Sequence, residues 1–110
     1  MEKLYKPLLT DSIKVPINID KHRFIGFDGN YCTEGAKALG VSEVEIEAGQ
    51  FAPVILNGIV LVRTAGTIIK GSKVASNLNG YAVAFTTGES NGYSLDDAEA
   101  GEIIRLVRGI

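Results

Sequence analysis

Two segments of this chain match one another, and this internal repeat constrains the fold more than any other feature of the sequence. Residues 40–56, GVSEVEIEAGQFAPVIL, align without a gap on residues 92–108, GYSLDDAEAGEIIRLVR. The identical positions are Gly40 with Gly92, Ser42 with Ser94, and Glu47-Ala48-Gly49 with Glu99-Ala100-Gly101. A unit of half this length buries little surface alone. We therefore expect two units, about 15–62 and 63–110, that fold as one body with pseudo-two-fold symmetry.

Short apolar segments rich in β-branched residues alternate with turn signals along the whole chain. The segments are RFIGF, FAPVIL, IVLVR, TIIK, YAVAF and EIIRLVR. Asp28-Gly29, Asn57-Gly58 and Asn79-Gly80 are dipeptides typical of two-residue hairpins. A helix over 94–108 is the alternative for the last segment, but Gly101 in its middle favours strand. The sequence predicts an all-β fold, a small β-barrel or sandwich.

The first residues differ from the rest, and we predict an extended N-terminal arm over 1–19 before a single β domain over 20–110. Pro7 and Pro16 remove backbone donors and hold the preceding residues extended. The arm is nevertheless too apolar to remain uncovered in water. It packs along the domain as an edge strand, or it contacts a neighbouring subunit or another protein, and both possibilities stay open. Its candidate contact residues are Leu4, Tyr5, Leu8, Leu9, Ile13, Val15 and Ile17.

The stretch GTIIKGSK, Gly66 to Lys73, is close to a phosphate-binding loop but has Ser72 and Lys73 in the reversed order. The repeat offers a simpler explanation, because IDKHRF (19–24) resembles IKGSKV (69–74). A phosphate loop also needs a following helix, and here another Asx-Gly turn follows. We interpret the stretch as a turn between strands.

Charge and composition exclude several classes of partner. The formal net charge is −2 with a pI of about 5.3, so the basic excess that nucleic-acid binding requires is missing. The first ten residues mix acid, base and proline among the apolar side chains, which fits neither a signal peptide nor a spanning segment. We expect no nucleic-acid partner, no membrane partner and synthesis in cytosol.

No set of residues in the sequence forms a recognisable catalytic or metal site. His22 and Cys32 are the only His and Cys, and neither stands in a signature context, so we expect a solvated imidazole and a buried thiol. Asp96, Asp97 and Glu99 lack the spacing of a calcium loop, which favours a solvated acidic turn. We predict no catalytic residue, no cofactor and no metal.

The order and spacing of several short motifs resemble one protein family. RFIGFDG, the A-x-x-L-G-V-S run from Ala36 to Ser42, and the closing GYSLDDAEAGEIIRLV are similar to the capsid cement or head decoration proteins of tailed bacteriophages and prophages, a phage-related domain of unknown function. The resemblance covers about 20–109.

The resemblance implies a structural protein that binds the outside of an assembled head and reinforces it. It implies that the major capsid protein is the partner, that the protein forms a homo-oligomer with a trimer favoured, and that it resides in the virion after synthesis in the bacterial host cytoplasm. It implies no catalytic residue. The alternative is a β-barrel ligand- or carbohydrate-binding module of a phage particle. Exposed aromatic rings distinguish the two, and the chain has no Trp and places Tyr31, Tyr81 and Tyr93 beside turn or linker glycines.

Overall fold

The computed structural model describes residues 6–109, and every regular element in this range is a β-strand. The strands are β1 (Lys6–Lys14), β2 (Phe24–Ile25), β3 (Gly40–Ser42), β4 (Phe51–Arg63), β5 (Lys73–Ser76), β6 (Ala82–Ala84), β7 (Gly92–Ser94) and β8 (Ile103–Arg108). The all-β prediction is confirmed, and the segment 94–108 contains strand where a helix was the alternative. Within the described range no helix has the length and apolar character needed to cross a membrane.

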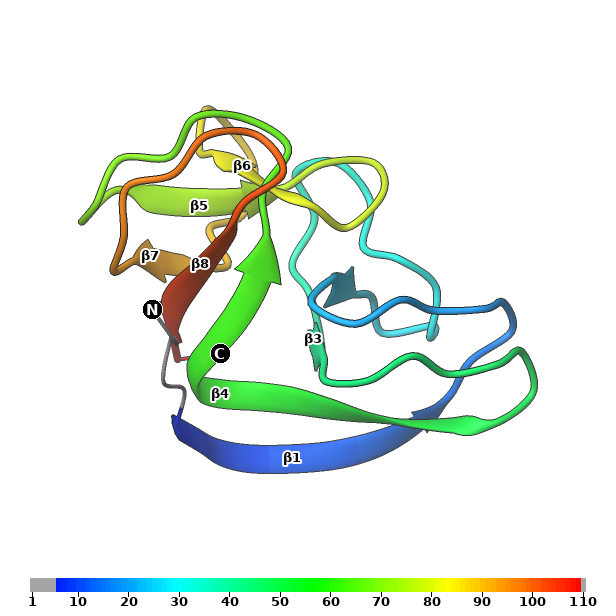
Figure 1. The fold of residues 1–110 in the computed structure, drawn as a ribbon. Coiled ribbons are helices and arrows are strands. Elements are labelled where there is room, and N and C mark those ends of the chain that lie inside the picture. Colours follow the sequence, from blue (N-terminus) through cyan, green and yellow to red (C-terminus); the bar gives the residue numbers. More distant parts are fainter. Residues whose placement is uncertain (1–5, 110) are drawn as a thin grey trace.

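All eight strands belong to one antiparallel sheet that curls into a nearly closed barrel (Figure 1). The strand order is β2-β3-β4-β8-β7-β5-β6, and β1 pairs with β4. The β6 end of the sheet returns to the chain that leaves β4, where Thr64 and Ala82 form a bridge and the Ala65 N–H donates to the Ala82 carbonyl at 2.9 Å. A small barrel was one of the two expected architectures, and this is the one observed.

The long strand β4 passes through both parts of the barrel and bends between them (Figure 1). Its early residues pair with β1 and β3, and its later residues pair with β8. Gly58, with φ of 111°, stands at the bend and is opposite both Pro7 and Arg108. The predicted Asn57-Gly58 hairpin is therefore wrong, because both flanking segments find partners distant in sequence.

The other two Asx-Gly dipeptides do form tight turns, although the loops are longer than the predicted two residues. The Gly26 N–H donates to the Asn30 carbonyl at 2.8 Å, and the Asn77 N–H donates to the Tyr81 carbonyl at 2.9 Å. Two features of position 80 require glycine. Its φ is 76°, and a Cβ there would stand 2.5 Å from the Phe24 carbonyl oxygen. This turn packs directly on β2.

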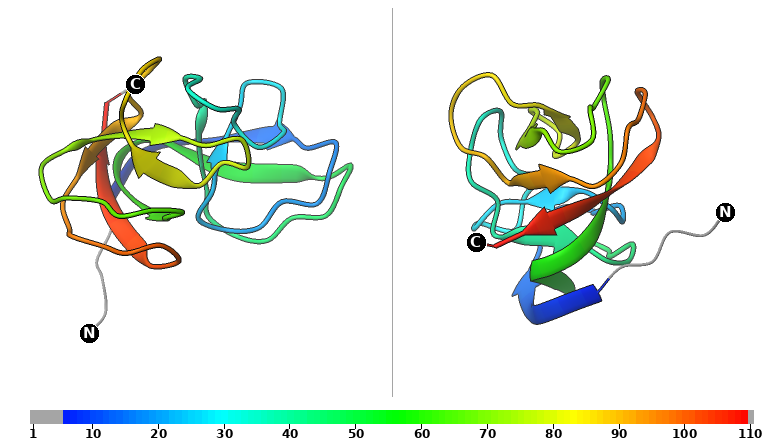
Figure 2. Two further views of the ribbon diagram at one scale, coloured as in Figure 1. Left: turned by 90° about the horizontal axis from the view of Figure 1, so that it is seen from above. Right: turned by 90° about the vertical axis from the view of Figure 1, so that its left-hand side faces the viewer.

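Residues 6–57, the first half, and residues 58–109, the second half, make corresponding hydrogen bonds, and they lie side by side in Figure 2. The Val15 N–H donates to Gln50 O in the first half, as the Thr64 N–H donates to Glu102 O in the second. The His22 N–H donates to Ser42 O, as the Gly71 N–H donates to Ser94 O. The bridge between Ile19 and Ile46 corresponds to the bridge between Ile68 and Ala98. Ile19 thus corresponds to Ile68, one position from the Ile69 expected from the sequence. In this arrangement β1 takes the place that the later part of β4 takes in the second half.

Two buried apolar clusters fill the barrel. One lies within the first half and contains Val15, Ile19, Ile25, Ala52 and Val54. The larger one combines second-half residues such as Val60, Ile104 and Leu106 with first-half residues such as Val41 and Ile55. Since the larger cluster draws on both halves, neither half has a complete core of its own.

Arg23 fixes the joint between the halves from outside the core. Its guanidinium carbon lies 3.8 Å from the Tyr81 ring centroid and 4.6 Å from that of Tyr31. The same group donates to the Tyr81 hydroxyl at 2.6 Å and to the Asn79 carbonyl at 2.9 Å. A stacked, planar guanidinium with fixed donors orients the two turns relative to each other.

Candidate interaction surfaces

The structure separates the residues of the predicted N-terminal contact into three groups. Leu4 and Tyr5 lie outside the described residues, and Leu8 and Leu9 belong to β1, whose backbone pairs with β4 inside the same chain. Ile13 is half-buried against the first-half core, and Val15 is fully buried within it. Ile17 remains exposed over 39% of its surface. Val15 therefore presents no surface to another protein, and Ile17 does.

Three exposed apolar side chains lie on the segments at one end of the first half, and we name Ile17, Val44 and Phe51 the first-half tip. Phe51 begins β4 opposite Lys14 and is exposed over 66% of its surface. Backbone hydrogen bonds hold the surrounding loops, since the Gly49 N–H donates to Val15 O at 2.7 Å and the Ala48 N–H donates to the Asn18 side-chain oxygen at 2.9 Å. The tip therefore combines three exposed apolar side chains with loops that are held by hydrogen bonds.

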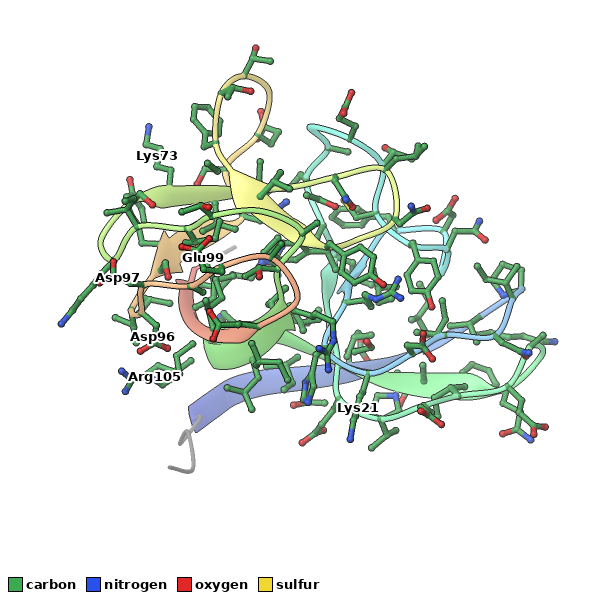
Figure 3. All side chains as sticks on the ribbon, turned by 45° about the horizontal axis from the view of Figure 1, so that its top comes forward. Lys21, Lys73, Asp96, Asp97, Glu99 and Arg105 are labelled. Carbon is green, nitrogen blue, oxygen red and sulfur yellow. The ribbon has the colours of Figure 1, made fainter. Side chains whose placement is uncertain are left out.

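The corresponding end of the second half has a different character. Its equivalent positions are Gly66, Asp96 and Ile103, and the Asp96 carboxylate pairs with Arg105 at 2.8 Å. Figure 3 shows this pair together at the side of the molecule. At the positions equivalent to the tip, the second half thus has one half-buried apolar side chain, Ile103, in place of three exposed ones.

The acidic residues of the second half tie loops together. One Asp97 carboxylate oxygen accepts from the Lys70 N–H at 2.8 Å, and one Glu99 oxygen accepts from the Thr67 hydroxyl at 3.0 Å. Both residues are labelled in Figure 3. Residues 6–109 contain no group of three His, Cys, Asp or Glu side chains that could hold a metal ion. The acidic loop is therefore a hydrogen-bonded turn, more tied to the fold than the solvated turn that we expected.

The two candidate groups for nucleophilic chemistry have separate structural surroundings. Burial, with the charges of Lys21 and Arg63, lowers the pKa of His22, which borders a cavity of about 40 Å³. Cys32 is buried in the larger core, and its thiol donates to the Ala36 carbonyl at 3.4 Å. Burial raises the pKa of this thiol, which keeps it protonated and unreactive. The buried thiol was expected; the half-buried imidazole was not.

Arg108 is a buried cation that the sequence analysis missed. It donates to the carbonyl oxygens of Ala38, Leu39 and Leu56, and burial lowers its pKa to about 10. These bonds fasten the 36–39 loop to the bend of β4. The inward alternation of Ile104 and Leu106 along β8 places the next inward position at 108, which is the sequence signal for this burial.

A groove of about 410 Å³ lies between the loops around Gly35 and Gly88, beside β5 and β6. Ser76, Thr86, Thr87 and Glu34 supply its polar side chains, and no aromatic ring is among the described residues that line it. Tyr31 and Tyr81 are instead engaged with Arg23. Neither the groove nor these rings form the open aromatic platform that carbohydrate binding requires.

Comparison with known proteins places this geometry in context. The family model described as phage cement protein matches residues 8–109. Among solved structures, the N base of head fiber gp8.5 in bacteriophage phi29 is similar, with a TM-score of 0.76, 18% sequence identity, and coverage of 92% of this chain and 93% of that chain. At this identity the likeness shows the shared fold. The search of curated proteins finds no match.

Proposed function

The chain belongs to the phage cement protein family, and from this premise we propose that it binds the outer surface of an assembled phage head and stabilises the capsid lattice. The observation that carries the proposal is the first-half tip, a set of exposed apolar side chains on loops held by hydrogen bonds. The shared fold with a phage head fiber base supports a structural role on the head. We assign no catalytic step, because the described ionisable groups discussed above serve the fold.

The proposed contact keeps the exposed part of the predicted N-terminal arm and adds residues from outside the arm. Ile17 belongs to both the predicted arm and the tip, and Phe51 and Val44 add apolar surface beside it. Burying exposed apolar side chains against a partner is favourable by about 25 cal/mol per Å². A rigid patch loses little conformational entropy on binding, so most of that gain is retained. Leu8 and Leu9 remain proposed contacts on β1.

Lattice stabilisation follows from binding the assembled head more tightly than its separated subunits. A ligand that binds only one state stabilises it by an amount that grows with ligand concentration over Kd. A head offers many equivalent sites, and a homo-oligomer engages several of them at once, which multiplies the effect through avidity. We therefore propose that the partner is the major capsid protein and that the protein acts as a homo-oligomer, with a trimer favoured, on the virion after synthesis in the host cytoplasm.

The test is co-sedimentation of the purified protein with phage heads that lack it, followed by heating of the decorated heads. We expect the wild-type protein to sediment with the heads and to raise the temperature at which they disassemble. Phe51→Asp and Ile17→Asp should each lower the affinity at least tenfold, because a carboxylate would have to lose its hydration at the contact.

Ile69→Asp is the matched control, since Ile69 is a similarly exposed apolar residue in a second-half turn. It should bind heads as the wild type does. Circular dichroism of each variant checks that the fold is retained. Wild-type protein that neither sediments with heads nor protects them from heat would refute the proposal. Equal binding by the Phe51→Asp and wild-type proteins would show that the tip is not the contact surface.

A further inference from the structure

A second exposed apolar surface lies on the outer face of the second half. Tyr93 on β7 stands directly between Lys73 on β5 and Val107 on β8, and these three residues form what we name the second-half row. Directly opposed residues of an antiparallel sheet point to the same face. Tyr93 is exposed over 49% and Val107 over 41% of their surfaces, and Ile59 on β4 continues the row half-buried.

The first half contains the same row in the same order, and there it is covered. Phe24 on β2 pairs with Val41 on β3, which pairs with Ile55 on β4. All three, the first-half row, are buried in the larger core together with second-half residues such as Val60 and Leu106. The described part of the chain therefore covers this face of the first half and leaves the corresponding face of the second half exposed.

The charges around the second-half row suit contact with another copy of this chain. Lys73 ends the row with a positive charge, its ammonium group 5.2 Å from the Phe85 ring centroid, and the Asp96–Arg105 pair lies beside β8. Figure 3 shows Lys73, Asp97, Asp96 and Arg105 along one side of the molecule. A face with both signs of charge around an apolar centre can meet another copy of the chain without net repulsion.

We propose that a second copy of this chain docks on the second-half row, with Tyr93 and Val107 at the centre of the contact. The first half supplies the precedent for the occupant, because the cover of its row is this same polypeptide. Tyr93 provides a large, rigid side chain of the kind that anchors protein interfaces. The inference rests on the proposed self-association and names its surface, which is separate from the first-half tip assigned to the head.

The experiment measures the oligomeric state of the full chain in solution, without heads, by sedimentation equilibrium over a wide range of protein concentrations. We expect the wild-type protein to associate and Val107→Asp to raise the dissociation constant at least tenfold. Tyr93→Glu is the second variant and should act in the same direction. Far-ultraviolet circular dichroism and thermal melting confirm that each variant is folded.

Leu78→Asp is the matched control, because Leu78 is an exposed apolar residue on the 77–81 turn and outside the row. It should associate as the wild type does. A wild-type protein that stays monomeric at every concentration, or folded Val107→Asp and Tyr93→Glu variants that associate normally, would overturn the inference. Binding to heads is measured separately with the tip variants, so failure of the self-association leaves the head-binding result to stand or fall alone.

Discussion

The two halves of this barrel make several corresponding hydrogen bonds but differ in what they leave exposed. The first half buries its outer row of Phe24, Val41 and Ile55 and exposes an apolar tip. The second half exposes the row that contains Tyr93 and Val107 and has a polar tip with Asp96. The corresponding row of residues is therefore part of the core in the first half and part of the surface in the second.

This difference shows that the contacts between the two halves, and not the local sequence of each row, decide which row is buried. The second half contributes residues to the core that covers the row of the first half. Among residues 6–109, no further segment covers the corresponding row of the second half, so Tyr93 and Val107 stay exposed. The polar tip of the second half, in contrast, carries the Asp96–Arg105 pair and needs no cover.

The sharpest test of this comparison, with the largest expected effect, substitutes the same row position in both halves. Ile55→Ala should lower the free energy of unfolding by about 2 to 5 kcal/mol, because it leaves a cavity in the core. Val107→Ala should change it by less than about 0.5 kcal/mol in the monomer, since the side chain is exposed. Urea unfolding at low protein concentration measures both. Equal losses would show that the two rows are not differently buried.

A second test contrasts two arginines on β8. Arg108→Met removes the donors to three carbonyl oxygens and should cost about 2 to 4 kcal/mol of unfolding free energy. Arg105→Met removes an ion pair at the surface and should leave the unfolding midpoint close to that of the wild type. Thermal denaturation compares them. A tolerated Arg108→Met would mean that the 36–39 loop does not depend on this buried cation.

A third test compares glycines at positive φ in the second half. Gly80→Ala should cost about 2 kcal/mol or more, because the left-handed backbone and the approach to the Phe24 carbonyl both disfavour a Cβ. Gly71→Ala has the same backbone strain but open space, so it should cost only about 1 kcal/mol. Chemical denaturation separates the two. Similar losses would show that the 77–81 turn can move away from β2.

The smallest effect is expected at His22, the counterpart of Gly71. Burial lowers the pKa of this imidazole from its ordinary value of 6.5, so the folded state binds its proton less readily than the unfolded state does. The contribution of His22 to stability is therefore present above pH 6.5 and is lost as the pH falls. His22→Asn keeps a residue suited to the positive φ of 63° and removes the titration.

Between pH 7 and pH 5 the unfolding free energy of the wild type should fall more steeply than that of His22→Asn. The groups that face the imidazole, Lys21, Arg63 and Glu43, are present in both proteins, so their titration is common to the comparison. Parallel pH profiles would contradict the lowered pKa.

The sequence predicted those parts of the fold that depend on local pattern. Strand segments before and after the E-A-G loops, the turns at Asp28-Gly29 and Asn79-Gly80, and the turn at Gly71 all follow from backbone preferences of a few residues. A dipeptide cannot show whether its flanking strands pair with each other or with remote partners, which is why Asn57-Gly58 proved to be a bend.

Features that depend on remote contacts could not be predicted in this way. Pro7 indicated an extended arm without showing its partner, and β1 pairs with β4, a placement in which a proline is accepted. Val107 and Ile55 are equally apolar, so the sequence alone does not show that one is exposed and the other buried. The tip has the same origin: Phe51 belongs to an apolar segment, and only the tertiary structure shows that its ring faces outward.

The continuous strand β4 has a mechanical consequence. No loop interrupts it between the halves, so the molecule lacks a hinge at which they could swing apart. Tension applied to both ends of β4 runs along the strand and strains its hydrogen bonds to β1 and β8 in shear, many at once, whereas a hairpin would open one bond at a time. Such a strand acts as a stiff tie between the halves rather than a spring.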